Sequence, residues 1–155
     1  GVMVVWYKLG LSIVLCLAIG FLSSFFTSTG PGSWHDNLTK PSFNPPNWLF
    51  GPVWTLLYLC MGVALYLLWV SDARLALLFF AIQLVLNFFW SYLFFTLQAP
   101  LLAFIEIVFL LAAIVLTMIF SYPVSLPAFY LFVPYLLWVL FASILNFAIY
   151  LFNNF

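Results

Sequence analysis

Only a few side chains of this 155-residue chain could take part in acid–base, nucleophilic or metal chemistry. There is one histidine, His35, besides two cysteines, three acidic residues and three basic residues. A protein metal site usually needs three or four clustered ligands, and Cys16 and Cys60 stand in separate apolar runs. We therefore predict no metal site and no acid–base catalytic residue. His35 as an axial ligand of a haem iron is the one metal-related alternative.

Aromatic side chains are the chain's main chemical resource, at 23% of all residues. Residues 34–58 are rich in both tryptophan and proline, because they contain three of the seven tryptophans and four of the nine prolines. Aromatic rings combined with a few polar groups form sites for flat, hydrophobic, partly polar ligands. The sequence thus favours binding of such a ligand over hydrolytic or metal chemistry.

The overall composition decides the class of protein. The chain is 68% hydrophobic and 4% charged, whereas an average soluble domain is about 25% charged. A chain of this length has too little interior to hide so much apolar surface from water. We expect membrane lipid to surround it. The formal net charge is zero, which argues against nucleic acid as a partner.

Five apolar runs are each long enough for a helix that crosses a bilayer, which takes about 20 residues. Lipid offers no water to backbone groups, so each run must be helical. We expect an all-α membrane protein, a single transmembrane domain over residues 1–155 built as a five-helix bundle. Pro134 should kink the fifth helix or mark a later helical start. The expected helices are 4–26, 46–70, 75–96, 100–122 and 128–152.

The connection between the first two expected helices is the anomaly of this arrangement. It has roughly 20 residues, and connections in helix bundles usually have about 2–8. Its prolines favour an ordered path. Trp34 and Trp48 would serve either as part of a cover over a ligand cavity or as aromatic anchors at the membrane surface. Both interpretations stay open, and we include Trp34 among the expected ligand-binding residues.

Polar residues inside the expected spans recur at helical spacing. Gln83, Asn87 and Ser91 are four residues apart, as are Trp138, Ala142 and Asn146, so each set lines one helix face. Amide side chains in membranes either join helices by hydrogen bonds or contact a ligand, and the spacing alone does not decide between these roles. A small-residue stripe in the first helix (Ser12, Cys16, Gly20, Ser24) predicts close helix packing.

Glu106 is the one carboxylate within an expected span. A carboxylate at membrane depth is a functional hypothesis by default. We expect Glu106 to be either protonated or bonded to a neighbouring tyrosine or amide, and to have a structural or gating role in preference to proton relay.

Three segments together resemble the translocator protein family, the TspO-type tryptophan-rich sensory proteins. The second segment is Asn87-Phe88-Phe89-Trp90-Ser91, and the third runs from Pro134 through Trp138 and Ala142 to Asn146. The carboxylate of the fourth helix matches as Glu106. The first and longest segment contains Trp34, Leu38, Lys40-Pro41, Phe43, Pro45-Pro46, Trp48, Gly51-Pro52-Val53-Trp54 and Leu57-Tyr58.

This resemblance implies a five-helix bundle, often a homodimer, that binds porphyrins and synthetic isoquinoline or benzodiazepine ligands. No cofactor would be obligatory, and porphyrin or haem would be a ligand. Animal members carry a cholesterol consensus ending in Lys or Arg, and this chain has no basic residue after Arg74. The resemblance therefore points to a bacterial-type member, a multi-pass protein of the bacterial cell membrane. The matching pocket residues are Trp54, Tyr58, Asn87, Trp90, Trp138, Ala142 and Asn146.

Three functions follow as hypotheses. The first is a membrane receptor or carrier for tetrapyrroles such as protoporphyrin IX and haem, bound in an aromatic cavity that the first loop closes. The second is an enzyme that degrades porphyrin in light and oxygen, with Trp54 and Trp138 as photochemical partners. The third is a regulatory membrane partner whose cavity is incidental.

Overall fold

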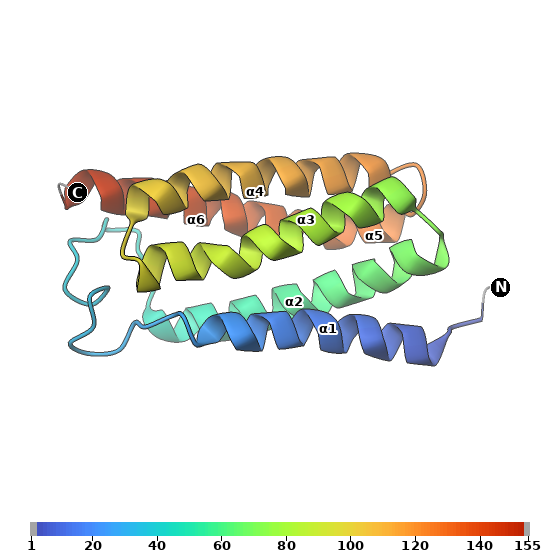
Figure 1. The fold of residues 1–155 in the computed structure, drawn as a ribbon, viewed down its shortest axis with the longest axis horizontal. Coiled ribbons are helices and arrows are strands. Elements are labelled where there is room, and N and C mark those ends of the chain that lie inside the picture. Colours follow the sequence, from blue (N-terminus) through green and yellow to red (C-terminus); the bar gives the residue numbers. More distant parts are fainter. Residues whose placement is uncertain (1–2, 154–155) are drawn as a thin grey trace.

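The computed structural model describes residues 3–153, and all regular structure in this part of the chain is helical (Figure 1). Five stretches are long and apolar enough to cross a membrane, as predicted. The elements are α1 (Trp6–Ser24), α2 (Asn47–Val70), α3 (Arg74–Ser91) with its π-helical continuation η1 (Tyr92–Thr96), α4 (Pro100–Ser121), α5 (Leu126–Leu131) and α6 (Val133–Phe152).

Helix boundaries depart from the prediction at three places. α1 is shorter at both ends than the expected 4–26. The third span finishes in the π-helical turn η1, which was not predicted. The fifth span is two helices separated at Phe132, and Pro134 lies in the first turn of α6. Proline has no N–H and suits the first turn of a helix, so the span is interrupted just before Pro134, although its first helix already begins at Leu126.

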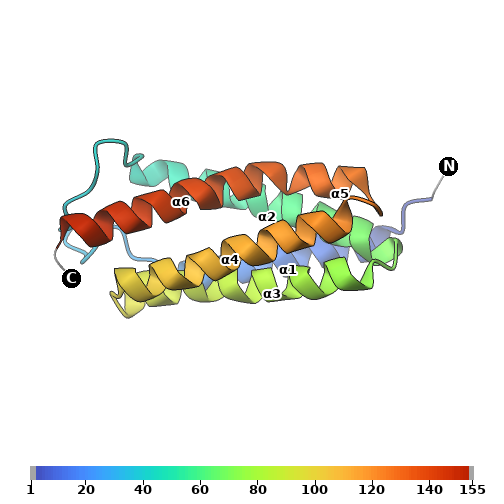
Figure 2. The ribbon, with the colours of Figure 1, turned by 90° about the horizontal axis from the view of Figure 1, so that it is seen from above.

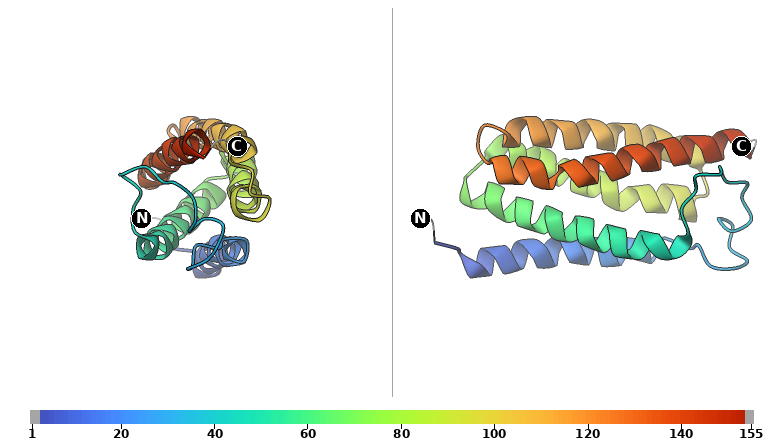
Figure 3. Two further views of the ribbon diagram at one scale, coloured as in Figure 1. Left: turned by 90° about the vertical axis from the view of Figure 1, so that its left-hand side faces the viewer. Right: turned by 180° about the vertical axis from the view of Figure 1, so that it is seen from behind.

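The helices lie roughly along one common axis, and α4 packs between α3 and α6 (Figure 2). The described part of the connection between α1 and α2 crosses one end of the bundle. The turn between η1 and α4 and the end of α6 lie at this same end (Figure 3). We call residues 25–46 the cover. The opposite end carries the start of α1 and the two short turns that follow α2 and α4 (Figures 1 and 3).

The cover is fixed to the bundle at Thr39, at Thr29 and at Phe26, whose carbonyl accepts from the Thr96 hydroxyl at 3.4 Å. Thr39 donates its backbone N–H to the side-chain oxygen of Asn153 and accepts a bond from the Asn153 amide, both at 2.8 Å. Asn47, the first residue of α2, donates to the carbonyl of Thr29 at 3.0 Å. These ties support the prediction of an ordered loop.

α1 and α2 approach each other closely over much of their length. A Cβ atom on Gly62 would come within 2.6 Å of the Ile13 backbone, and one on Gly20 would come within 2.5 Å of the Tyr58 ring. Ser12 and Cys16 are buried in the same contact, as the small-residue stripe predicts. Only glycine leaves room for such backbone proximity.

Candidate ligand cavity

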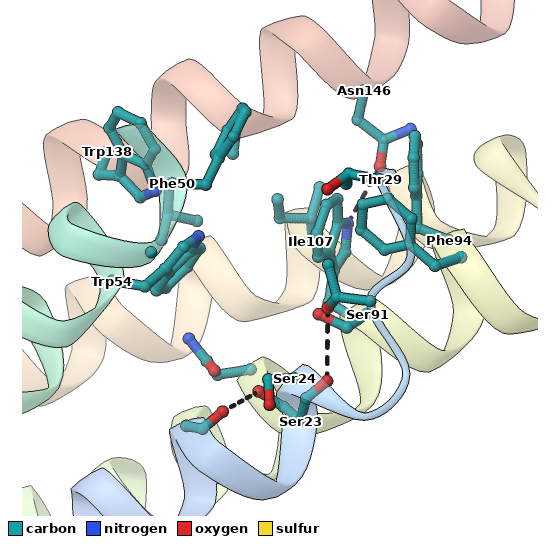
Figure 4. Close-up of a pocket in the computed structure, with 18 of the residues that line it drawn as sticks. Ser23, Ser24, Thr29, Phe50, Trp54, Ser91, Phe94, Ile107, Trp138 and Asn146 are labelled. Carbon is teal, nitrogen blue, oxygen red and sulfur yellow. Dashed lines mark hydrogen bonds between the residues drawn. The ribbon is translucent and has the colours of Figure 1, made fainter. Parts of the chain in front are cut away.

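A cavity of about 530 Å³ lies under the cover, between α1, α2, α3, α4 and α6 (Figure 4). This volume falls within the range of roughly 300–1,000 Å³ typical of small-molecule sites. Its lining is mainly aromatic and aliphatic, with a few hydroxyl and amide groups. The lining includes Gly20, Phe21, Ser24, Thr29, His35, Asn47, Phe50, Gly51, Trp54, Thr55, Tyr58, Asn87, Trp90, Phe94, Ile107, Trp138, Ala142 and Asn146.

Two tryptophans from different helices form one wall. Trp54 of α2 and Trp138 of α6 have ring centroids 6.4 Å apart and nearly perpendicular planes, and Phe50 packs edge-on against Trp138 at 5.8 Å. Figure 4 shows these three rings gathered at one side of the cavity. The buried indole N–H of Trp138 has no hydrogen-bond partner within residues 3–153. A buried donor without an acceptor costs free energy, so a ligand oxygen or nitrogen reaching it would be stabilised.

A buried chain of hydrogen bonds forms the inner end of the cavity. The Tyr58 hydroxyl donates to the side-chain oxygen of Asn87. The Asn87 amide donates to the Tyr135 hydroxyl at 2.8 Å, and that hydroxyl donates to Gln83 at 2.7 Å. The chain joins α2, α3 and α6. Asn87 therefore has both of the roles that the sequence left open, since it links helices and also lines the cavity.

Asn146 also links helices and lines the cavity, at a place nearer the cover. Its side-chain oxygen accepts from the Trp90 indole at 3.0 Å, and its amide donates to the carbonyl of Pro100 at 2.9 Å. Trp90 in turn stacks on Phe94 at 5.1 Å. These contacts hold α3, α4 and α6 together beside the open volume, as Figure 4 shows for Asn146 and Phe94.

His35 is the aromatic residue of the cover that lines the cavity, and it is only 4% exposed. Its ring lies 5.3 Å from that of Phe95. Burial, and after it the charge of Lys40, lower the pKa of His35 to about 4, and Asp36 partly opposes the shift. The imidazole is therefore neutral at physiological pH. Its Nδ1 atom has no hydrogen-bond partner among the described residues.

Trp34 lies behind this lining. Its ring contacts the edge of Phe94 at 5.6 Å and packs against the cluster of Phe94, Ala103, Leu145 and Ile149. Among the described residues, the wall at this point is formed by His35 and Phe94. The expected position of Trp34 in the cover is thus correct, but its contact with a bound ligand would be indirect.

For Glu106, one of the two expected alternatives, the hydrogen-bonded one, is not met. Both carboxyl oxygens are buried, and neither has a hydrogen-bond partner within the described part of the chain. The alternative of a hydrogen bond to a tyrosine or amide is therefore not realised within residues 3–153. Glu106 is also not among the described residues that line the cavity.

The other seven predicted site residues (Trp54, Tyr58, Asn87, Trp90, Trp138, Ala142, Asn146) all line this one cavity. The predicted site residues did not include Phe50, Phe94 and Ile107. Phe94 flanks the polar face of the third span, whereas Phe50 and Ile107 have no feature that separates them from other apolar residues of the spans. No three His, Cys, Asp or Glu side chains between residues 3 and 153 come close enough to hold a metal ion. The arrangement can bind and orient a flat ligand.

The fold and cavity define a multi-pass helical membrane protein with an internal aromatic cavity. The sequence profile of the TspO/MBR family matches residues 12–151, and the chain belongs to that family. It is 51% identical to the tryptophan-rich protein TspO of Archaeoglobus fulgidus, over 94% of this chain and 97% of that protein. It is also 51% identical to the TspO of Chlorobaculum tepidum, over 91% and 92%. The human translocator protein is 34% identical, over 86% and 83%.

Proposed function

We propose that this protein is a membrane receptor or carrier that binds tetrapyrroles, with protoporphyrin IX and haem as the ligand class. The observation that carries the proposal is the aromatic cavity with Trp54 and Trp138 on one wall. Flat conjugated rings gain both apolar burial and ring–ring contact in such a site.

The polarity of the cavity supports the same class of ligand. No described residue that lines it is Asp, Glu, Lys or Arg, and His35 is neutral because its pKa is about 4. An uncharged wall would accept a macrocycle and disfavour deep burial of its carboxylates, since an unpaired buried charge is costly. The carboxylate edge would stay near the cover, and the unpaired Trp138 N–H would meet an acceptor on the macrocycle.

Filling the cavity tests this proposal. Ala142 lines the cavity, whereas Ile144 lies two residues away on the same helix and is 59% exposed. Ala142→Phe should weaken protoporphyrin IX binding at least tenfold in a tryptophan-quenching titration. Ile144→Phe is the matched control and should retain the native dissociation constant. The absence of saturable quenching in the native protein would contradict tetrapyrrole binding and leave the regulatory partner as the remaining hypothesis.

A second candidate function is porphyrin breakdown that needs light and dioxygen. The observation in its favour is the adjacent pair of indoles, Trp54 and Trp138, 6.4 Å apart on the cavity wall. Indole is readily oxidised, so either ring would be a suitable reaction partner for an excited porphyrin. Product formation under illumination, compared with that from free porphyrin, separates this function from simple binding.

The family resemblance also leads us to propose a homodimer located in a bacterial cell membrane. The five membrane-spanning helices support the membrane location. The mass of the detergent-solubilised protein, measured by light scattering with the detergent contribution subtracted, would test the dimer.

A further inference from the structure

The cavity reaches the outer surface of the bundle between α1 and α2. Four residues that line it are also exposed on that surface: Phe21 and Ser24 of α1, and Gly51 and Thr55 of α2. Phe21 alone is 66% exposed. Because both helices belong to membrane-spanning stretches, this surface faces lipid. We call the gap framed by these four residues the window.

The spacing between α1 and α2 explains why the window is confined to one region. Closer to the start of α1, Gly62 meets the Ile13 backbone and Gly20 meets the Tyr58 ring, so the helices are in tight contact. At Gly51, by contrast, an added Cβ would have no atom within 4 Å. Beyond Gly51, the bond from Asn47 ties the start of α2 to Thr29 of the cover.

The end of the cavity that faces the membrane surface is covered. His35 and Thr29 contribute to the lining from the cover, and the paired bonds between Thr39 and Asn153 fasten the cover to α6. Lys40 bonds the carbonyls of Asp36 and Leu38 and holds the middle of the cover together. These bonds hold the cover over this end of the cavity, whereas exposed residues of α1 and α2 frame the window.

The rim of the window is chemically suited to contact with lipid. The Ser24 hydroxyl donates to the carbonyl of Phe21, and the Thr55 hydroxyl donates to the carbonyl of Gly51 at 2.8 Å. Each hydroxyl is therefore satisfied within its own helix, so neither would present an unpaired donor to hydrocarbon. The remaining rim surface is the Phe21 ring, methyl and methylene groups, and glycine.

We propose that the ligand enters and leaves this cavity laterally, from the lipid phase, through the window between α1 and α2. The window lies in the last turn of α1 and the first turns of α2, near the end of each span. That depth suits an amphiphilic planar molecule whose rings lie among lipid chains and whose carboxylates stay at the headgroups. This inference rests on the proposed tetrapyrrole binding and adds the route to it.

Blocking the window tests the route. Gly51→Phe places a ring in the open space, and Thr55→Phe approaches the same gap from the next turn. The protein in lipid nanodiscs is mixed with phosphatidylcholine vesicles that contain protoporphyrin IX, and association and dissociation are followed by tryptophan quenching. Both rates should fall at least fivefold. Simple damage to the binding site would instead raise the dissociation rate.

Two controls separate the outcomes. Gly10→Phe adds the same ring at an open position on α1 that is far from the window. This variant should leave both rates unchanged. Asn153→Ala loosens the cover; a faster association in this variant, with native rates in Gly51→Phe and Thr55→Phe, would overturn lateral entry in favour of entry from water. An absence of quenching in the native protein would instead overturn tetrapyrrole binding itself, and this route with it.

Discussion

Several single residues in this protein serve both folding and the cavity. Asn87 accepts from Tyr58 and donates to Tyr135, and it also presents part of its amide to the open volume. Tyr135 is fully buried, and its hydroxyl donates a hydrogen bond to the side-chain oxygen of Gln83. In a lipid-surrounded bundle such bonds are a source of helix–helix specificity, because apolar packing alone distinguishes poorly between neighbours.

Removing the central hydroxyl of this chain should weaken the fold. Tyr135→Phe leaves the amide of Asn87 and the oxygen of Gln83 without their partner, so we expect the free energy of unfolding in detergent to fall by about 1–3 kcal/mol. Tyr130→Phe is the control, because Tyr130 is 62% exposed and should change nothing. Equal stability of both variants would show that the buried hydrogen bonds contribute little to the free energy of unfolding.

The indole rings of Trp54 and Trp138 should matter less for binding than for photochemistry. Trp54→Phe and Trp138→Phe each keep a ring, and ring contacts contribute about 0.5–1.5 kcal/mol beyond burial. We expect each change to weaken protoporphyrin IX binding tenfold or less. If the indoles react with excited porphyrin, the double variant should lose light-driven breakdown while it still binds, because phenyl is much harder to oxidise.

Absorbance titration and illumination of the same samples measure both quantities. Trp48→Phe is the control, since Trp48 is 71% exposed. Full breakdown by the double variant would exclude a photochemical role for these indoles, and unchanged affinity in all variants would place the ligand elsewhere.

Residue spacing could predict part of the cavity from the sequence. Asn87 and Trp138 are conspicuous because polar and indole groups recur there at four-residue intervals in apolar helices. Tyr135 could not be found in this way, since a tyrosine in an aromatic-rich run has no distinguishing pattern. The bonding state of Glu106 was also beyond prediction, because it depends on whether neighbouring groups are already paired. The sequence places Trp34 in the cover. Whether its ring lines the cavity or packs behind the lining depends on three-dimensional packing, which the sequence does not show.

Among the structural elements, the cover contains a group whose ionisation couples its stability to pH. His35 lies buried within it between the cavity and the rings of Phe94 and Phe95. Its pKa is lowered from 6.5 to about 4, first by burial and then by Lys40. The folded cover therefore requires the neutral imidazole, whereas an opened cover lets His35 bind a proton at its ordinary pKa.

The direction of the pH effect follows from this difference. Above about pH 6.5, His35 is neutral in both states and the folded state has its full stability. As the pH falls towards 4 the opened state binds the proton first, so the folded state loses stability. We expect the native protein to lose on the order of 1 kcal/mol more than His35→Phe between pH 7 and pH 5. Denaturant unfolding at both pH values measures this, and identical pH dependence would contradict it.

Helix positions were the most predictable elements because length and apolarity alone determine a bilayer-crossing helix. The division of the fifth span was also foreseeable, since Pro134 cannot continue an existing helix. The π-helical turn Tyr92–Thr96 was not foreseeable. Such turns arise from local fit between packed helices, and no residue type in that segment demands one.

At the scale of the whole molecule, the seam between α1 and α2 determines how much of the cavity is closed. The two glycines in tight contact, Gly20 and Gly62, set the distance between these helices. Where that contact ends, the gap that we call the window begins. A change that pushes the helices apart at the seam should therefore affect both stability and the enclosure of the ligand.

Gly62→Ala tests the seam. Its new Cβ would lie 2.6 Å from the Cα atom of Ile13, and a backbone atom cannot yield without moving the helix. We expect the free energy of unfolding to fall by about 1–3 kcal/mol, as measured by thermal or denaturant unfolding in detergent. Gly10→Ala, which adds its methyl in open space, should be neutral. A neutral result at Gly62 would show that α1 shifts freely.

The tie between Thr39 and Asn153 also has a consequence for biosynthesis. The two residues are 114 positions apart in the chain. The ribosome makes the cover long before it makes its anchor on α6, and the anchor reaches its place only when the last span has been inserted. Throughout membrane insertion the cavity therefore lacks its final fastening. A tetrapyrrole present in the membrane during that interval would meet an unfastened cover, and the finished protein could enclose a ligand acquired while it was still being made.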